Sequence, residues 1–468
     1  MIFSELFFIY CFLAFFFLLY FIIRDIRWKN AVLIIFSLAF YAFGELYWIL
    51  ILLFSTGVNF FAGIMIEKHP DNNTRKKLGV AVCLVTCLGL LCAFKYSGFA
   101  AENINAVLGT AIPVPKPALP LGISFYMFRL ISYTLDVYWG KVNAQGNFLK
   151  FLLYISIFST IIAGPITRYS SMKNELSVRK TDIVQISGGI TRFITGLGKK
   201  VIIADNLIVV VNDFFGGDIS KLSVMGTWYA VILFALWVYF DFSGYSDMAI
   251  GIGGIIGFKF DENFNYPFIC KNITEFWQRW HISLGSFFRD YLLYLPIFGK
   301  RRQILNLFLV WFCTGLWHGA SWNYVIWGLY FGVFIFIERK IGNKRMKKIP
   351  RPVLHIYNKL IIIIGFGIFY FTDINKLGQF FMNLAGAGGN AFTDAVTETS
   401  FMNNIFLFTA AALLCLPVIP ALKKKFRALN DGRLGGDAIR TAVNLALLIV
   451  CSLMMVNSTS QPFLYANF

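Results

Sequence analysis

LNLFLVWFCTGLWHGASWNYVIWGLYFGVFIFI, residues 305–337, is an almost unbroken apolar and aromatic run. A transmembrane helix needs about 20 residues, so this run is too long for one upright helix and too short for two full crossings. Basic residues flank it on both sides, at 300–302 and 339–351. Because Lys and Arg gather in cytoplasmic loops, we predict a helical hairpin that turns at 319–321. His318 would then lie deep in the membrane, beside the turn.

The rest of the chain has the same character. Of its 468 residues, 58% are hydrophobic and only 14% are charged, whereas a soluble domain carries about 25% charged residues. This composition excludes an ordinary soluble enzyme, and it excludes disorder, which requires low hydrophobicity and high charge. The apolar runs are continuous rather than alternating, which argues against an outer-membrane barrel. We therefore predict an all-α protein that crosses the membrane many times.

Further apolar segments recur along the chain, and the first of them lacks the basic start and small-residue cleavage site of a removed signal peptide. They are 7–23, 30–44, 47–66, 78–96, 119–138, 149–167, 186–212, 226–256, 357–372, 403–422 and 441–457. At the usual length per crossing, we expect about 10–12 transmembrane helices, with some segments re-entrant or interfacial. Residues 385–400 are typical of an external loop. No linker is visible, so we expect one membrane domain over residues 1–468.

The net charge of +18 is unusual for such a chain. Its basic residues gather in loops, which include 24–29, 68–77, 168–180 and 423–440. No Lys or Arg precedes Arg24, which places the N-terminus outside and the 24–29 loop in the cytoplasm. The charge therefore indicates membrane topology rather than nucleic-acid binding. We expect a multi-pass protein of the cell (inner or cytoplasmic) membrane, in contact with lipids and with no nucleic-acid partner.

The eight cysteines indicate neither disulfides nor a metal site. Most lie inside apolar runs, where Cys behaves as a small hydrophobic residue. Cys83, Cys87 and Cys92 have helical spacing without a nearby His, unlike a closed zinc site. We expect no bound metal or cofactor.

Ionisable residues within apolar runs are functional candidates because they are costly to place in a membrane. Asp241 and Asp247 interrupt the run 226–256. On a helix, Asp241 shares a face with Tyr245, and Ser243 shares one with Asp247. This cluster is either a hydrogen-bonded seam between helices or part of a substrate site.

Two of the four histidines are candidates for chemistry. His318 lies within the apolar run, and a buried imidazole is kept neutral, as a general base must be. His281 follows an aromatic, amphipathic segment in which Glu275 and Arg279 have the spacing of an i, i+4 ion pair. Trp277 and Trp280 suit a helix that lies along the membrane surface, or one that lines the mouth of a cavity. His69 and His355 lie in basic loops.

Taken in order, motifs along nearly the whole chain resemble the membrane-bound O-acyltransferases (MBOATs), specifically their bacterial alginate O-acetyltransferase-like branch. The core of the resemblance spans 119–332. The motifs are LPLGISFY (119–126), ISYTLDVY (131–138), AGPITR (163–168), GKKVIIADN (198–206), YFDFSGYSD (239–247), NFNYP (263–267), EFWQRWHISL (275–284), RDY (289–291), LWHGASW (316–322) and PFLY (462–465).

The resemblance implies an all-helical bundle around a central funnel, with an acyl donor entering from the cytoplasm and a hydroxyl acceptor from outside. It assigns the catalytic His to His318 and the second characteristic polar position to His281. The resemblance also implies that acetyl-CoA is the donor and that the acetyl group ends on an exported polysaccharide, often through a secreted SGNH-type partner. Two departures stand out: LPIFGKR (295–301) replaces the usual IPLGGNR, and Phe331 stands where a His is common.

We therefore expect an O-acyltransferase in which His318 deprotonates the attacking hydroxyl. Donors to the oxyanion would come from His281, from Asn323, or from the indole of Trp317 or Trp322. Arg289 or the basic loops would hold the donor's phosphates. Asp241, Tyr245 and Asp247 are further candidates for substrate or donor binding.

Three alternatives remain open at this point. One is a D-alanyl transferase for teichoic acids, in which a carrier protein supplies the acyl group. Another is a polysaccharide or lipid transporter that uses Asp241, Asp247 and His318 as a proton or substrate path, although no inverted repeat is visible. The third is an inactive scaffold for a secreted acyltransferase. The acceptor glycan is not identified by any motif.

Overall fold

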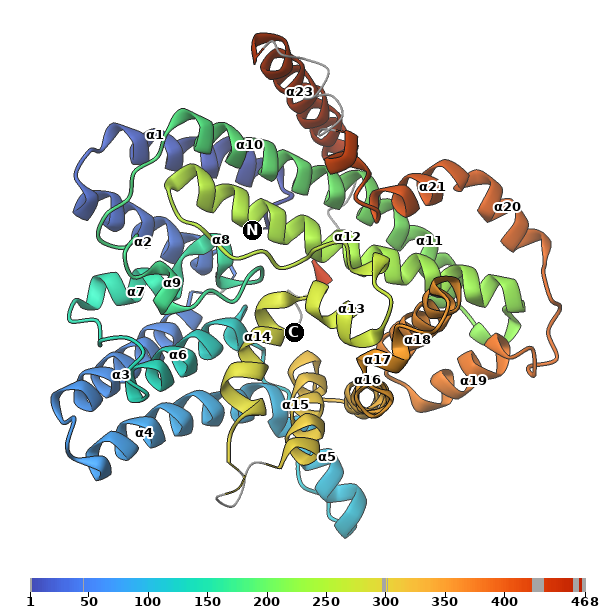
Figure 1. Cartoon of the computed structure of the whole chain (residues 1–468), viewed down its shortest axis with the longest axis horizontal. Helices are drawn as coiled ribbons and strands as arrows, with labels where there is room; N and C mark the ends of the chain where they lie inside the picture. Colours follow the sequence, from blue (N-terminus) through green and yellow to red (C-terminus); the bar gives the residue numbers. More distant parts are fainter. Residues whose placement is uncertain are drawn as a thin grey trace. The chain divides into compact units, whose positions relative to one another are not determined.

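The structure is a computed structural model that describes residues 2–44, 46–296, 300, 302–422, 433–457 and 463–464. Its regular elements are helices (Figure 1), which confirms the predicted all-α fold class. The chain divides into two compact units. The first comprises Met1–Phe193, Tyr245–Glu262 and Pro462–Phe468, and the second comprises Ile194–Gly244 and Asn263–Gln461.

The first unit is built from the N-terminal helices. They are η1 (Phe7–Leu13), α1 (Ala14–Ile22), α2 (Ile26–Ala42), α3 (Trp48–Lys68), α4 (Asn73–Leu91), η2 (Cys92–Tyr96), α5 (Ser97–Leu108), α6 (Ile123–Tyr138), α7 (Phe148–Ser156), α8 (Phe158–Ile161) and α9 (Tyr169–Met172). Helix α6 is the centre of this unit, because nearly all its side chains are buried, including the Arg129 guanidinium.

One expected span of the first unit is wrong as a single helix. The segment 149–167 breaks at Ile157 into α7 and α8. Arg129 explains the break, since its guanidinium donates to the carbonyl oxygens of Tyr154 (3.4 Å), Ile155 (3.1 Å) and Thr160. Carbonyls that point toward a buried cation cannot all continue a regular helical ladder. Hydropathy alone carries no signal for such a break.

Two helices, α10 (Ile183–Gly198) and α12 (Val224–Ile256), run from one unit into the other. Within the first unit they approach closely, because a Cβ atom on Gly251 would lie 2.7 Å from the carbonyl oxygen of Gly189. The glycines at 251–257 therefore include a helix-packing surface, as small residues do between membrane helices.

The remaining helices form the second unit. They are η3 (Lys199–Ala204), α11 (Asp205–Phe215), η4 (Ile219–Lys221), η5 (Pro267–Ile269), α13 (Ile273–Arg279), α14 (Ile282–Phe288), η6 (Arg289–Leu293), α15 (Gln303–His318), α16 (Trp322–Ile341), α17 (Asn343–Met346), α18 (Arg351–Tyr370), α19 (Ile374–Leu384), α20 (Ala395–Asn403), α21 (Ile405–Leu414) and α23 (Arg433–Asn457).

The predicted hairpin is present in the second unit. Helices α15 and α16 pack along each other and are joined by residues 319–321. Their close approach requires glycine, because a Cβ atom on Gly315 would collide with the backbone of Tyr324 and one on Gly328 with that of Trp311. The prediction of a turn at 319–321 is thus confirmed.

Five described helices are long and apolar enough to cross a membrane: Trp48–Lys68, Asn73–Leu108, Val224–Ile256, Arg351–Tyr370 and Gly436–Val456. The chain is therefore a multi-pass membrane protein. These five helices are selected by length and composition alone, so the expected total of about 10–12 crossings stays a prediction. Parts of the motifs at 295–301 and 462–465, and of the basic loop at 423–440, lie outside the described residues.

Candidate active site

His318 is the last residue of α15 and is 2% exposed. Three aromatic rings surround its imidazole, with centroid distances of 4.8 Å to Trp317, 4.7 Å to Trp327 and 5.1 Å to Phe369. These rings come from α15, α16 and the end of α18. The sequence-predicted base therefore sits in an aromatic cage at the tip of the hairpin.

The turn after His318 is held in place from α18. Helix α15 ends because Gly319 is extended (φ 177°, ψ 158°), and a Cβ atom there would collide with the ring of Tyr324. Helix α16 then begins, and its buried Asn323 donates from Nδ2 to the carbonyl oxygens of Ile368 (3.3 Å) and Phe369 (3.2 Å). These bonds fasten the hairpin tip to the end of α18, so Asn323 has a positioning role.

His281 lies between α13 and α14 and is also 2% exposed. Its backbone is left-handed (φ 44°, ψ 52°), a conformation that is uncommon outside glycine and that concentrates at functional sites. The Nδ1 atom lies 3.2 Å from Oδ1 of Asn263, and the ring contacts Phe242 at 4.6 Å between centroids. Burial lowers the pKa of His281 to about 3, because desolvation disfavours the imidazolium.

One indole contacts both imidazoles. Trp317 lies 5.5 Å from the His281 ring and 4.8 Å from the His318 ring, with edge-to-face geometry in each case. The second unit thus brings together the two histidines that were predicted from the sequence. They lie 37 positions apart in the chain. This pair and the rings around it are the candidate active site.

Comparison with known proteins identifies the family of the chain. Residues 142–377 match the model of MBOAT, the membrane-bound O-acyltransferase family, and these residues include both histidines. The chain belongs to the MBOAT family. A probable alginate O-acetylase, AlgI, from Pseudomonas putida is 32% identical over the full length of both chains. The peptidoglycan O-acetyltransferase of Helicobacter pylori is 30% identical over 100% of this chain and 98% of its own. The teichoic acid D-alanyltransferase of Bacillus subtilis is 30% identical over 58% of this chain and 78% of its own.

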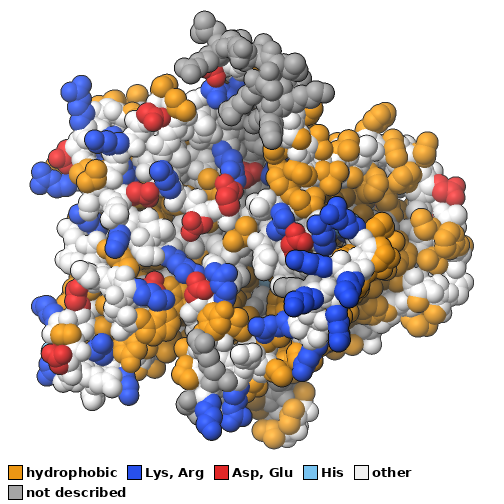
Figure 2. Space-filling view, in the orientation of Figure 1, with side chains coloured by type: hydrophobic (Ala, Val, Ile, Leu, Met, Phe, Trp, Pro, Cys, Tyr) orange, Lys and Arg blue, Asp and Glu red, His pale blue; other side chains and the backbone are white. Residues whose placement is uncertain are grey.

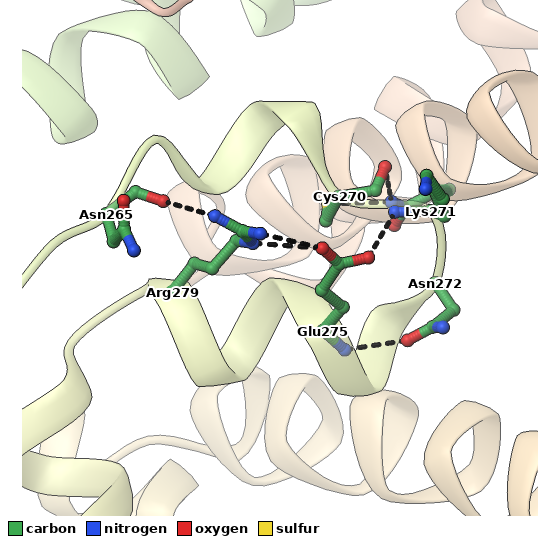
Figure 3. Close-up of polar contacts among 7 residues, drawn as sticks. Asn265, Cys270, Lys271, Asn272, Glu275 and Arg279 are labelled. Atoms are coloured by element: carbon green, nitrogen blue, oxygen red, sulfur yellow. Dashed lines mark hydrogen bonds and ion pairs between the residues drawn. The ribbon is translucent and has the colours of Figure 1, made fainter. Parts of the chain in front are cut away.

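Polar contacts hold both ends of the segment before His281. Figure 3 shows the predicted ion pair, in which Arg279 contacts Glu275 at 3.0 Å and also donates to the carbonyl oxygen of Asn265 at 3.2 Å. Asn272 caps α13 by accepting from the amide of Glu275 at 2.7 Å. Trp280 is buried whereas Gln278 is exposed, so the segment has one buried face; whether it lies along the membrane surface or lines the mouth of a cavity stays a prediction.

A carboxylate that the sequence analysis did not identify holds the start of α13. Glu338, near the end of α16, is 6% exposed. It accepts hydrogen bonds from the amides of Ile273 (2.6 Å) and Thr274 (2.9 Å), and from the hydroxyl of Thr274 (2.6 Å). An anion is stabilised at a helix N-terminus, and here it ties the base of the hairpin to the helix that leads to His281.

Asp241 belongs to a buried ionic triad. Its carboxylate lies 2.8 Å from Nζ of Lys200, which also contacts Asp205 at 2.7 Å. Asp241 is 0% exposed and Lys200 is 2% exposed. Lys200 and Asp205 are not among the site residues expected from the sequence, although charged residues within the apolar run 186–212 were a readable signal. The triad favours a structural role for Asp241.

Asp247 and Tyr245 lie in the first unit. Arg192 contacts Asp247 at 2.6 Å and Glu262 at 2.5 Å. The ring of Tyr245 stacks on Phe3 (4.5 Å) and on Phe463 (4.6 Å). Substrate binding by these two residues stays a prediction, and both already have structural neighbours.

The remaining candidates are more exposed. Arg289 pairs with the adjacent Asp290 at 2.9 Å, and 56% of its side chain is exposed. Trp322 is 50% exposed.

Phe331, at the position where the family often has His, is buried against Trp277 (5.0 Å) and Trp327 (5.3 Å). In this acyltransferase the Phe331 side chain therefore packs against Trp327, one of the rings around His318, and supplies no imidazole.

Proposed function

We propose that this acyltransferase moves an acetyl group from a cytoplasmic thioester donor, acetyl-CoA, to a hydroxyl of an exported polysaccharide, directly or through a secreted SGNH-type partner. The observation that carries the proposal is the pair of buried histidines on one indole. The names of the full-length relatives, an alginate O-acetylase and a peptidoglycan O-acetyltransferase, support a glycan acceptor. The protein would lie in the cytoplasmic membrane with its N-terminus outside.

The reaction is a single transfer. The oxygen of the acceptor hydroxyl attacks the thioester carbonyl carbon while the imidazole of His318 takes the hydroxyl proton. The C–S bond then breaks, and the thiolate leaves and receives that proton from His318. General base catalysis of this kind contributes roughly 10²–10⁴-fold. In this mechanism no acyl-enzyme forms, so no nucleophilic side chain of the protein is needed.

The oxyanion that forms during the attack requires a hydrogen-bond donor in a low-dielectric site. Among the expected donors, the indole N–H of Trp317 is placed best, because its ring contacts both imidazoles. The Nδ2 group of Asn323 already donates to two backbone carbonyls, and Trp322 is half exposed. We therefore assign the oxyanion to Trp317.

The donor's phosphates would bind to exposed cations at the end of α16. Figure 2 shows Lys and Arg side chains gathered where Figure 1 draws α16, α17 and α18. The exposed residues of this basic strip are Arg339, Lys340, Lys344, Arg345, Lys347, Lys348 and Arg351. Charge-assisted hydrogen bonds to phosphate oxygens are strong and favour such clusters. The more isolated Arg289, which pairs with Asp290, is the weaker candidate.

A second candidate function is D-alanyl transfer to teichoic acids, fed by a carrier protein. The Bacillus subtilis relative favours it, although that match covers a smaller part of this chain than the O-acetylase match does. Both functions would use His318.

Purified protein in lipid nanodiscs tests the proposal. With acetyl-CoA and a soluble glycan acceptor we expect release of free CoA and acetylation of the glycan, both lost in His318→Ala. Acyl transfer from a D-alanyl carrier protein but not from acetyl-CoA would establish the second function instead. Single cysteines at 300 and 344 should be labelled from the same side of the membrane if the hairpin enters from the cytoplasm.

A further inference from the structure

Asn263 contacts His281 through a single oxygen atom. This Asn is 0% exposed, and its Oδ1 lies 3.2 Å from Nδ1 of His281. The same Oδ1 accepts from the backbone amide of Ser283 at 3.2 Å and from its hydroxyl at 2.9 Å. Three polar groups therefore converge on one side-chain oxygen.

The backbone amide of Ser283 determines the chemistry of this contact. A backbone N–H can only donate, so the amide atom of Asn263 that it faces must be the oxygen and not the nitrogen. An amide oxygen can only accept, so Nδ1 of His281 must carry a proton. In a neutral imidazole with Nδ1 protonated, Nε2 has a lone pair and no hydrogen.

The backbone keeps Asn263 and His281 in this register. The amide of Ile282 donates to the carbonyl of Asn263 at 3.0 Å, and the amide of Asn265 donates to the carbonyl of Arg279 at 2.9 Å. These two bonds bracket His281 on either side and hold it in its left-handed conformation. Two charged groups on adjoining elements form ion pairs, Arg279 with Glu275 and Asp241 with Lys200. His318, on α15, is a titratable group that contacts the same indole.

We infer that Asn263 is a positioning residue that fixes His281 as the neutral Nδ1–H tautomer, so that His281 acts through Nε2 as a hydrogen-bond acceptor for a second hydroxyl of the acceptor glycan, next to the attacking one. This inference rests on the proposed function, because it assumes that His281 faces substrate. It replaces the expectation that His281 donates to the oxyanion, since a neutral Nε2 without hydrogen cannot donate. His281 then orients the glycan through this second hydroxyl, and His318 takes the proton of the attacking hydroxyl.

The tautomer can be measured directly, because the chain has only four histidines. Nitrogen-15 spectra of histidine-labelled protein in lipid vesicles distinguish a protonated from a bare ring nitrogen, and His281→Gln assigns the signals. We expect His281 to have a protonated Nδ1 and a bare Nε2. An Nε2–H tautomer in the unaltered protein would overturn the inference.

Two substitutions of Asn263 test the role in catalysis. Asn263→Asp keeps an acceptor oxygen and adds a negative charge, which stabilises imidazolium; the acid limb of the rate profile should move to higher pH. Asn263→Leu removes the acceptor, and we expect kcat to fall at least about tenfold with the KM for acetyl-CoA unchanged. The same two substitutions at the exposed Asn375 are the matched control.

The possible outcomes separate the inference from the proposed function. If Asn263→Asp has the pH profile of the unaltered protein, the inference is wrong even when His318→Ala is inactive. If His318→Ala retains full transfer, the proposed function is wrong, whatever tautomer the spectra report. Should Asn263→Leu fail to fold, Asn263→Asp and the spectrum of the unaltered protein still decide the matter.

Discussion

The second unit buries two clusters of ionisable side chains, and their surroundings differ. The Lys200–Asp205–Asp241 triad satisfies its charges by ion pairs of 2.7 and 2.8 Å. The two histidines instead contact neutral groups, which include the ring of Trp317 and, at His281, the amide of Asn263. The clusters are near each other, since Phe242, which follows Asp241, contacts His281 at 4.6 Å. A buried charge that is paired with an opposite charge contributes to the fold. A buried neutral imidazole keeps a nitrogen lone pair that can accept a proton from a substrate.

The comparison breaks most visibly at His318. We expect His318→Ala to lower acetyl transfer by at least about 100-fold, because general base catalysis is lost, while the melting temperature changes little. Release of CoA by purified protein measures the first effect, and thermal unfolding in detergent measures the second. His355→Ala is the control; the structure places His355 in the first turns of α18 rather than in a loop. Equal loss of stability and activity would mean that His318 is structural.

The triad should respond in the opposite way. Lys200→Met leaves two buried carboxylates without their cation, and breaking a buried ion pair costs about 3–5 kcal/mol. We expect a large fall in the melting temperature, with activity per folded molecule retained at low temperature. Asp241→Asn should have the same sign. A stable but inactive Asp241→Asn protein would move Asp241 from the scaffold into the active site.

Glu338 tests whether the scaffold around α13 belongs to the histidine cluster. Glu338→Gln keeps the shape but removes the charge at the N-terminus of α13, so we expect a loss of about 1–2 kcal/mol in stability. Activity should fall only partly, with kcat affected more than the KM for the donor. Glu398→Gln, on α20, is a carboxylate control. Unchanged kcat in a destabilised Glu338→Gln protein would show that this cap does not position His281.

The smallest expected effect concerns pH. The folded pKa of His281 is about 3, below its ordinary value of 6.5, so the unfolded chain binds a proton that the folded chain does not. This contribution to stability is complete above pH 6.5 and is lost as the pH falls toward 3. Between pH 7.5 and pH 5.5 we expect a loss of about 1 kcal/mol from this group. The loss should be absent in His281→Gln, and its persistence there would assign it to other groups.

Much of the site could be predicted because its signals are local. The length and flanks of 305–337 predicted the hairpin and its turn beside His318, and both are present. The spacing of Glu275 and Arg279 predicted an ion pair that forms. Ordered motifs predicted the family, which the comparisons confirm.

The partners of these residues could not be predicted, because they come from distant parts of the chain. Glu338 reaches Ile273 across 65 positions, and no pattern on either helix indicates the contact. The sequence left Asp241 open as part of a hydrogen-bonded seam or of a substrate site, because its partner Lys200 lies on an earlier helix. The break at Ile157 depends on Arg129, which apolar periodicity does not register.

The bond between Glu338 and α13 has a mechanical consequence. The hairpin carries His318 at its tip, and α13 leads to His281; Glu338 joins their bases, and Trp317 touches both imidazoles. The hairpin and α13 are therefore joined at two points, through Glu338 at their bases and through Trp317 at the histidines. When a ligand binds to the basic strip, which directly follows Glu338, the hairpin and α13 should move together as one rigid body. The distance between the two histidines should then stay unchanged.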